Sequence, residues 1–218
     1  GERAFRYCQL DVGHAVGALA YAAALLGWAV RPLAVPGETL ASLLGLDRAE
    51  DFPPSRYAFT ENEEPEILLA IEGPGLQPIP ALSVLLERLQ AATWQGQPTR
   101  IDPSPGYRWP VIDQAAAASR RTADAEAPAS APNFPAQPPL PDHPGTASAA
   151  QLIRQRRSAQ RFNPKCSLPQ AAFYRILDAV LPRPGLPFSA QEADPRLQLL
   201  LFVLRVDGLS PGLYLLPR

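Results

Sequence analysis

The longest hydrophobic pattern in the chain lies at its beginning. Apolar and small side chains recur there at the three- and four-residue spacing of a helix, at Phe5, Cys8, Val12, Ala15, Val16, Leu19, Ala22, Ala23 and Leu26. We predict a helix within residues 2–30, and Gly13 and Gly17 would let a second backbone approach it closely. We therefore expect this helix to be buried on several sides.

A membrane span is the alternative interpretation of this segment, because no Asp, Glu, Lys or Arg occurs from residue 12 to residue 30. The stretch is rich in Ala and Gly rather than Leu, and His14 would lie inside it. Both features favour a core helix, so we expect no membrane partner.

Shorter patterns follow along the first two thirds of the chain. Residues 39–46 predict a short amphipathic helix that ends near a glycine. The apolar run 65–73, bounded by Pro and Gly, predicts a buried strand. Residues 81–93 and 111–120 predict two further helices.

The last block begins with residues 148–157, which predict a helix with Ser148 as its N-cap. Residues 168–181 repeat the helical pattern, and residues 197–206 form the best strand pattern in the chain. An Asp-Gly pair then predicts a turn into a second strand at 212–216, which completes a hairpin. Because the chain stops directly after this strand, we expect a truncated domain.

Proline divides the chain into three parts. The sequence has 27 prolines, more than twice the usual share of about 5%. Residues 123–145 are rich in Ala, Pro and Ser and predict a disordered linker, with a polyproline ligand as the alternative. We therefore expect two structured parts, 1–73 and 148–218, and a Pro/Ala-rich connector with short helices at 74–147. The chain contains no Met, so we expect it to begin inside a longer protein or to be processed.

Charge and composition exclude several classes of function. The net charge is -1, from 20 basic and 21 acidic residues, which gives no reason to expect a nucleic-acid partner. Cys8 and Cys166 lie too far apart in sequence to suggest a disulfide framework, so we expect a cytoplasmic protein. No phosphate-binding glycine loop, GxSxG elbow or zinc-ligand spacing occurs, and we predict no metal site.

The two histidines are weak catalytic candidates. His14 lies on the apolar helix, where we expect a hydrogen-bonded structural role, and His143 lies in the proline-rich linker, where we expect it to be solvated.

One polar cluster remains, and it follows the helix predicted at 148–157. Three guanidinium groups and a hydroxyl occur within six residues, at Arg156, Arg157, Ser158 and Arg161. Such a donor set suits a phosphate and a polyhydroxylated chain, because the planar fork of an arginine holds two oxygens at once. The alternative interpretation is a solvated helix end.

The sequence of residues 156–162, Arg-Arg-Ser-Ala-Gln-Arg-Phe, resembles the RRSxRxF signature that opens domains of the FMN-dependent nitroreductase-like family. Residues 206–214 are similar to the V-x-G-L-x-P-G-L-Y segment of its SagB-type thiazole/oxazole dehydrogenase subgroup. Residues 1–14 resemble the start of the long central helix of that subgroup. Residues 43–46 and 64–71 resemble its closing helix and strand.

The order of these motifs implies a tandem protein. A family domain runs from the arginine motif through the hairpin to the long helix and the last strand, whereas here the last parts come first. The chain would then keep the second half of one domain and the first half of the next. A circularly permuted single domain is the alternative. The resemblance implies an α+β fold with nitroreductase-like helices packed on an antiparallel sheet, present as two partial domains.

The resemblance also implies an FMN-dependent oxidoreductase that transfers a hydride through the flavin. Arg156, Arg157 and Ser158 would contact the phosphate and ribityl chain, and Arg161 would assist. A small-molecule substrate, a nicotinamide as one candidate electron donor, and a dimer or intramolecular pseudo-dimer are the expected partners. We identify no catalytic acid or base.

Two departures from the family pattern keep other functions open. Residues 27–32 lack the paired glycines of the family's phosphate loop, and residues 188–194 replace its serine- and glycine-containing loop. One alternative is a flavin-free pseudo-oxidoreductase acting as a scaffold or dimerisation partner. The other is a proline-rich adaptor whose linker binds the partner.

Overall fold

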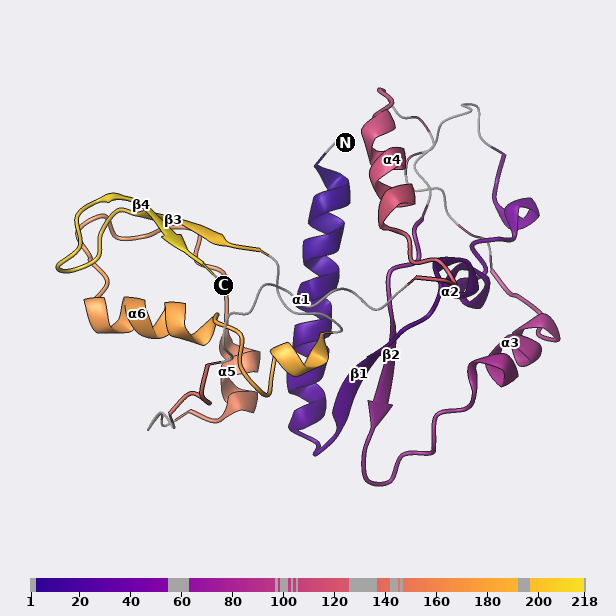
Figure 1. Cartoon of the computed structure of the whole chain (residues 1–218), viewed down its shortest axis with the longest axis horizontal. Helices are drawn as coiled ribbons and strands as arrows, with labels where there is room; N and C mark the ends of the chain where they lie inside the picture. Colours follow the sequence, from indigo (N-terminus) through magenta and orange to yellow (C-terminus); the bar gives the residue numbers. More distant parts are fainter. Residues whose placement is uncertain are drawn as a thin grey trace. The chain divides into compact units, whose positions relative to one another are not determined.

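The fold is given by a computed structural model. It describes residues 3–54, 63–96, 98, 102, 104, 106–125, 137–141, 145, 147–191 and 197–217. The chain divides into two compact units, Gly1–Ala127 and Pro128–Arg218, which we call unit 1 and unit 2. Figure 1 labels their helices and strands.

Unit 1 begins with the long predicted helix, α1 (Ala4–Ala24). The helix ends earlier than residue 30, because Gly27 adopts a φ of 72° and turns the chain into strand β1 (Ala29–Leu33). The Trp28 amide closes this turn by donating to the Ala23 carbonyl at 3.0 Å. The sequence pattern missed β1, since its first two residues continue the uncharged run after α1 and the strand includes a proline at position 32.

Helix α1 is buried on one face, where it packs against β1. Its buried residues are Val16, Ala20 and Ala23. A Cβ added at Gly13 or Gly17 would meet no atom within 4 Å. The prediction of burial on several sides is therefore wrong for the described part of the chain, because a two-stranded sheet is too narrow to cover a second face. No helix of the described residues combines the length and hydropathy that a membrane span requires.

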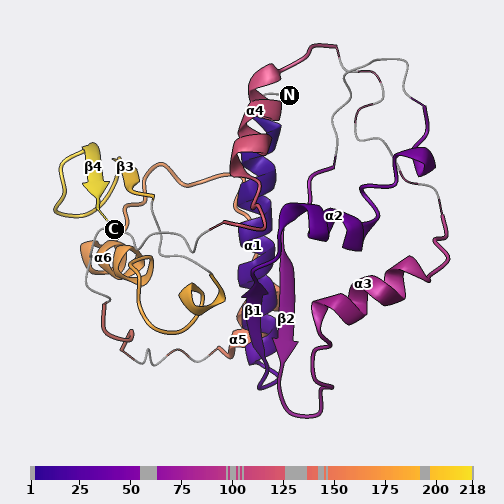
Figure 2. The same ribbon diagram turned by 45° about the vertical axis from the view of Figure 1, so that its right-hand side comes forward.

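Strand β1 pairs with β2 (Leu68–Glu72) in an antiparallel register that runs from Ala29 opposite Glu72 to Leu33 opposite Leu68. This confirms the strand predicted within 65–73. Figures 1 and 2 show α1 on one side of this strand pair and α2 with α3 on the other. The buried Val30 and Ala70 place the small core of unit 1 between these layers.

The remaining helices of unit 1 match three predicted segments. They are α2 (Gly37–Leu44), α3 (Leu82–Gln90) and α4 (Pro110–Ser119), with a short 3-10 helix at Ala49–Asp51. Helix α2 contacts α3, and the Gly37 amide donates to the Arg121 carbonyl at 2.8 Å. Helix α3 and Arg121, which lie before and after α4 in the chain, thus pack on α2 as parts of unit 1, although the sequence analysis assigned both to the connector.

The described residues of unit 2 form two α-helices and a hairpin. They are α5 (Ala149–Gln155), α6 (Gln170–Ala179), β3 (Leu199–Val203) and β4 (Gly212–Leu216), with a 3-10 helix at Phe188–Ala190. Strands β3 and β4 are antiparallel, with Leu199 opposite Leu216 and Val203 opposite Gly212. The predicted hairpin is thereby confirmed, and Gly208, with a φ of 75°, lies in its turn.

Helix α6 lies beside this hairpin in both views (Figures 1 and 2). The chain entering α6 is tied to the end of β3, because the Leu168 amide donates to the Arg205 carbonyl and the Asp207 amide donates to the Leu168 carbonyl, each at 3.0 Å. The Ser167 hydroxyl also donates to Asp207 Oδ1 at 2.5 Å.

The mixture of helices and small antiparallel sheets confirms the α+β class. Most of the predicted linker at 123–145 lies outside the described residues. Where it is described, the Gln137 amide donates to the Pro182 carbonyl at 2.8 Å. The buried Arg183 guanidinium donates to the Pro138 carbonyl at 2.9 Å, so this end of the segment is fixed to unit 2.

Candidate functional site

The predicted donor cluster begins where α5 ends. Ser148 starts the helix as predicted, its hydroxyl oxygen accepting a hydrogen bond from the Gln151 amide at 3.2 Å. The last helical bond runs from the Arg156 amide to the Leu152 carbonyl at 2.9 Å. Arg156 then turns to a ψ of 134°, and residues 156–159 continue without regular secondary structure.

Within this cluster, the Arg157 side chain forms hydrogen bonds to other residues of the protein. Its Nη1 donates to the Arg154 carbonyl at 2.9 Å and to the Arg156 carbonyl at 2.8 Å. A cation placed on the last carbonyls of a helix satisfies acceptors that have no helical partner and is favoured by the helix dipole. Arg157 therefore caps α5 and fixes the start of the arginine segment.

Arg156, Ser158 and Arg161 are exposed, and no described residue forms a hydrogen bond or ion pair with their side chains. The local sequence adds positive charge, because residues 148–177 include no Asp or Glu. In that range the basic side chains are Arg154, Arg156, Arg157, Arg161, Lys165 and Arg175. The structure thus presents unpaired cationic donors on a continuous segment, where the sequence placed them.

A turn fixes the far end of this segment. Asn163 Oδ1 accepts a hydrogen bond from the Lys165 amide at 3.0 Å, and the Asn163 carbonyl accepts one from the Cys166 amide at 3.2 Å. Such a local side-chain bond is typical of Asn in turns. Every residue from 151 to 167 is exposed, so the segment is held at both ends and open to solvent along its length.

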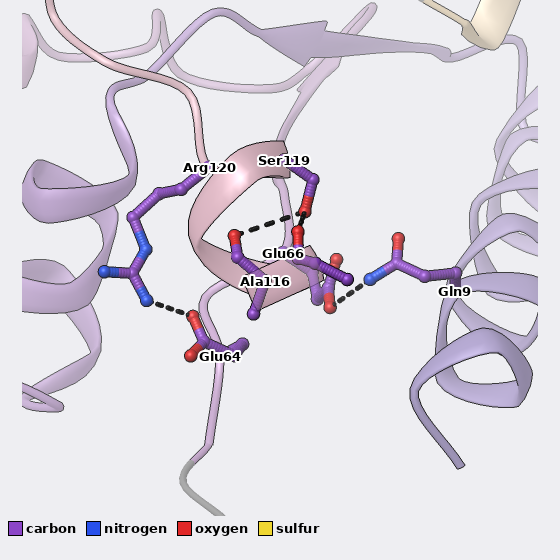
Figure 3. A network of polar contacts seen from close by, with 7 residues as sticks. Gln9, Glu64, Glu66, Ala116, Ser119 and Arg120 are labelled. Carbon is purple, nitrogen blue, oxygen red and sulfur yellow. Dashed lines mark hydrogen bonds and ion pairs between the residues drawn. The ribbon is translucent and has the colours of Figure 1, made fainter. Parts of the chain in front are cut away.

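A second polar cluster lies in unit 1 and was not predicted as a site. Glu64 and Glu66 precede β2, and Figure 3 shows Glu66 between α4 and Gln9 of α1, with Glu64 next to Arg120 at the end of α4. Arg120 Nη2 donates to Glu64 Oε2 at 2.5 Å, and Gln9 Nε2 donates to Glu66 Oε1 at 2.6 Å. The two carboxylates are thus joined to the end of α4 and to α1. These contacts link elements of unit 1, and we assign them a structural role.

Unit 1 also contains an open groove of about 490 Å³. Its lining residues are Arg31, Glu72, Gly73, Leu76, Gln77, Pro78 and Ile79. Arg31 Nη2 pairs with Glu72 Oε1 at 2.8 Å, so the cation in this groove is already neutralised by a carboxylate. The groove is therefore a poorer phosphate site than the arginine segment.

His14 contributes no catalytic geometry among the described residues. His14 Nδ1 lies 3.0 Å from the Leu10 carbonyl, one helical turn earlier, so a structural hydrogen bond forms as predicted. His14 is exposed rather than enclosed by apolar side chains. His143 lies outside the described residues.

Comparison with models of known protein families, with curated proteins and with solved structures finds no match to this chain.

Proposed function

We propose that the chain is part of an FMN-dependent oxidoreductase of the nitroreductase-like family, related to the SagB-type dehydrogenases, and contains portions of two such domains. One observation carries the proposal. The side chains of Arg156, Ser158 and Arg161 are exposed donors without partners among the described residues, and they lie on the segment that resembles the RRSxRxF signature.

These donors fit the phosphate of FMN. A phosphate monoester carries about -1.5 to -2 charge at neutral pH and presents acceptor oxygens that match the fork of a guanidinium. Arg156 and Arg161 would supply charge-assisted hydrogen bonds, and the Ser158 hydroxyl a neutral one. Arg157 would orient the segment through its bonds to the α5 carbonyls, and its remaining N–H groups are left for the ligand.

Bound FMN would supply the chemistry of hydride acceptance and donation. The residues of this chain would hold the phosphate and so fix the position of the cofactor relative to a small-molecule substrate. A nicotinamide is one candidate for the electron donor.

A flavin-free scaffold is the second candidate function, and the geometry after α1 favours it. Gly27 turns the chain directly into β1, and the residues that follow are engaged in pairing with β2. That segment would have to approach the phosphate in a flavin-binding family member.

The binding test compares FMN with riboflavin, which lacks the phosphate. Arg156→Ala and Arg157→Ala should each weaken FMN binding about 10- to 100-fold, since a hydrogen bond to a charged group contributes about 1.5–3 kcal/mol. Riboflavin binding should change little. Ser158→Ala should have a smaller effect on FMN, because its hydroxyl contact is neutral.

Arg154→Ala is the matched control, because it removes a guanidinium from the same helix but outside the motif. Titration of each variant by flavin fluorescence quenching gives the dissociation constants. Unchanged FMN affinity in both Arg156→Ala and Arg157→Ala would reduce the motif to a solvated helix end. A purified protein without visible flavin absorbance, even after FMN is added, would favour the scaffold.

A further inference from the structure

Prolines recur at every third residue in the sequence that precedes α5. They are Pro132, Pro135, Pro138, Pro141 and Pro144. A polyproline II helix has three residues per turn, so prolines at this spacing share one of its faces. A residue that precedes a proline is also confined to extended conformations, because the proline ring would clash with it in the α conformation. In the described part of this segment, residues 137–141, the sequence therefore favours polyproline II.

The segment 137–141 is attached to unit 2 at its first two residues. The Gln137 amide donates to the Pro182 carbonyl at 2.8 Å, and Arg183 Nη1 donates to the Pro138 carbonyl at 2.9 Å. The buried guanidinium is fixed in turn by the hydrogen bonds that it donates near the end of α6. Both attachments use the backbone of the segment, so they leave the proline rings free.

The rest of the segment is open to solvent. Residues 138–141 are all exposed, and Leu140 is 41% exposed. Among the residues that the structure describes, Pro139, Leu140 and Pro141 form no hydrogen bond with the rest of the protein. Residues 127–141 include no Asp, Glu, Lys or Arg. The segment thus presents apolar rings, a leucine side chain and free carbonyl acceptors, without any charge.

We propose that residues 138–141, Pro-Pro-Leu-Pro, bind the aromatic-lined groove of a polyproline-recognising domain of the WW type while they stay attached to unit 2. Grooves of this kind receive two prolines spaced three residues apart. Their Tyr and Trp side chains offer an apolar ring to the prolines and an O–H or N–H donor to the free carbonyls. A groove that selects charged peptides would gain nothing here, because the segment carries no charge to pair.

Attachment to unit 2 favours this binding. A flexible segment pays conformational entropy when a partner orders it, and a segment that is already ordered pays less. Arg183 is therefore a positioning residue for the partner, because it holds the Pro138 carbonyl without covering the ring. The inference goes beyond the flavin proposal, since no residue of the arginine segment takes part in it.

Calorimetric titration of the full chain with a purified WW domain that recognises Pro-Pro-Leu-Pro tests the proposal. The native chain should bind, and the double variant Pro138→Ala/Pro141→Ala should bind at least about tenfold more weakly, because each substitution removes two ring methylenes from the groove. Leu140→Asp should weaken binding at least about tenfold as well, since it would bury a carboxylate against aromatic rings.

Pro80→Ala is the matched control. Pro80 is an exposed proline of unit 1 with no proline three residues before or after it. Its replacement should leave the dissociation constant within about twofold, as expected for a surface substitution. The double variant Pro138→Ala/Pro141→Ala should in turn leave the FMN titration unchanged, so the two proposals fail or succeed separately.

Hydrogen exchange at the Gln137 amide tests the attachment. This amide is bonded to unit 2 in the free chain, so it should be protected and should stay protected when the WW domain is bound. A native chain that does not bind the WW domain up to about 1 mM would overturn the proposal. So would binding that both the double variant and Leu140→Asp leave unchanged. Loss of Gln137 protection on binding would show that the segment must detach from unit 2, which also contradicts the proposal.

Discussion

Gly45 ends α2 in the left-handed conformation and lies against the ring of Trp94, and both features favour glycine at this position. Its φ is 70°, and a Cβ added there would lie 2.8 Å from the Trp94 ring. We expect Gly45→Ala to destabilise unit 1 by about 2–3 kcal/mol, because a left-handed conformation disfavours alanine by about 1–2 kcal/mol and the clash adds to this. Chemical denaturation measures the effect.

Gly75 provides the matched control for this substitution. Its φ is 79°, but a Cβ there would meet no atom within 4 Å. Gly75→Ala should therefore show the conformational penalty alone, about 1–2 kcal/mol. Equal losses of stability in the two variants would mean that Trp94 moves aside without penalty.

Arg183 is a buried charged residue of unit 2, with its side chain only 5% exposed. Its guanidinium donates to the carbonyls of Pro138 at 2.9 Å and Leu181 at 3.3 Å, to Asp178 Oδ1 at 3.0 Å and to the Asp178 carbonyl. We expect Arg183→Ala to destabilise unit 2 by about 2–4 kcal/mol, because each partly buried carbonyl that loses its donor contributes about 1–3 kcal/mol.

The control for Arg183 is Arg175→Ala, which removes an exposed guanidinium from α6. Its effect should stay within about 0.5 kcal/mol, as expected for a surface substitution. Arg183→Lys should recover only part of the loss, because an ammonium cannot reproduce the planar fork that reaches several acceptors. Full recovery with Lys would show that charge rather than geometry is required.

At the scale of the element, α5 is a helix of 7 residues that depends on its two caps. A helix of this length is marginal by itself in water. Ser148→Ala should therefore fray α5, with a loss of about 1 kcal/mol, and should speed hydrogen exchange at the Gln151 amide. Ser148→Asp should restore protection, since Asp is an equally good N-cap. Unchanged exchange in Ser148→Ala would mean that the Arg157 cap suffices.

Strand β1 shows how one turn changes an element. Its residues follow α1 without any charge until Arg31, so the hydrophobic pattern alone extends the helix. The left-handed Gly27 ends the helix, and antiparallel pairing with β2 makes residues 29–33 a strand. This pairing joins segments about 40 residues apart, which a local pattern does not specify.

At the scale of the whole molecule, tryptophan fluorescence can distinguish the unfolding of unit 1 from that of unit 2. Trp28, Trp94 and Trp109 all belong to unit 1, whereas circular dichroism reports on the helices of both. We expect Gly45→Ala to shift the denaturation curve followed by tryptophan fluorescence. Arg183→Ala should shift the unfolding transition of unit 2, which appears in the circular-dichroism curve, and should leave the fluorescence curve unchanged.

Equal shifts of both signals in both variants would show that the two units unfold as one cooperative structure. Two-state unfolding is common for single domains but not for chains with more than one unit. The experiment therefore decides whether stability is a property of the chain or of each unit.

Local patterns in the sequence were sufficient for most helices, for β2 and for the β3–β4 hairpin. Helical spacing predicted α1, α2, α3, α4 and α6, and the Ser148 hydroxyl identified the start of α5. The donor residues Arg156, Arg157, Ser158 and Arg161 could also be named from the sequence, because they are neighbours along the chain. Their cofactor stays a prediction that rests on the resemblance.

Only the tertiary structure decided which apolar faces are buried and which arginine side chains form hydrogen bonds within the protein. A pattern of apolar positions gives the face that a helix or strand can bury, but not whether a neighbour covers it. Helix α1 and the β3–β4 hairpin are both more exposed than their composition indicates, because α1 packs against β1 on one face only and the hairpin exposes Leu200, Phe202, Leu213 and Leu215. Arg156 and Arg157 are adjacent residues of the same type, and the sequence does not distinguish them. The course of the backbone at the end of α5 brings the Arg157 side chain to the carbonyls of Arg154 and Arg156, whereas the Arg156 side chain has no partner among the described residues.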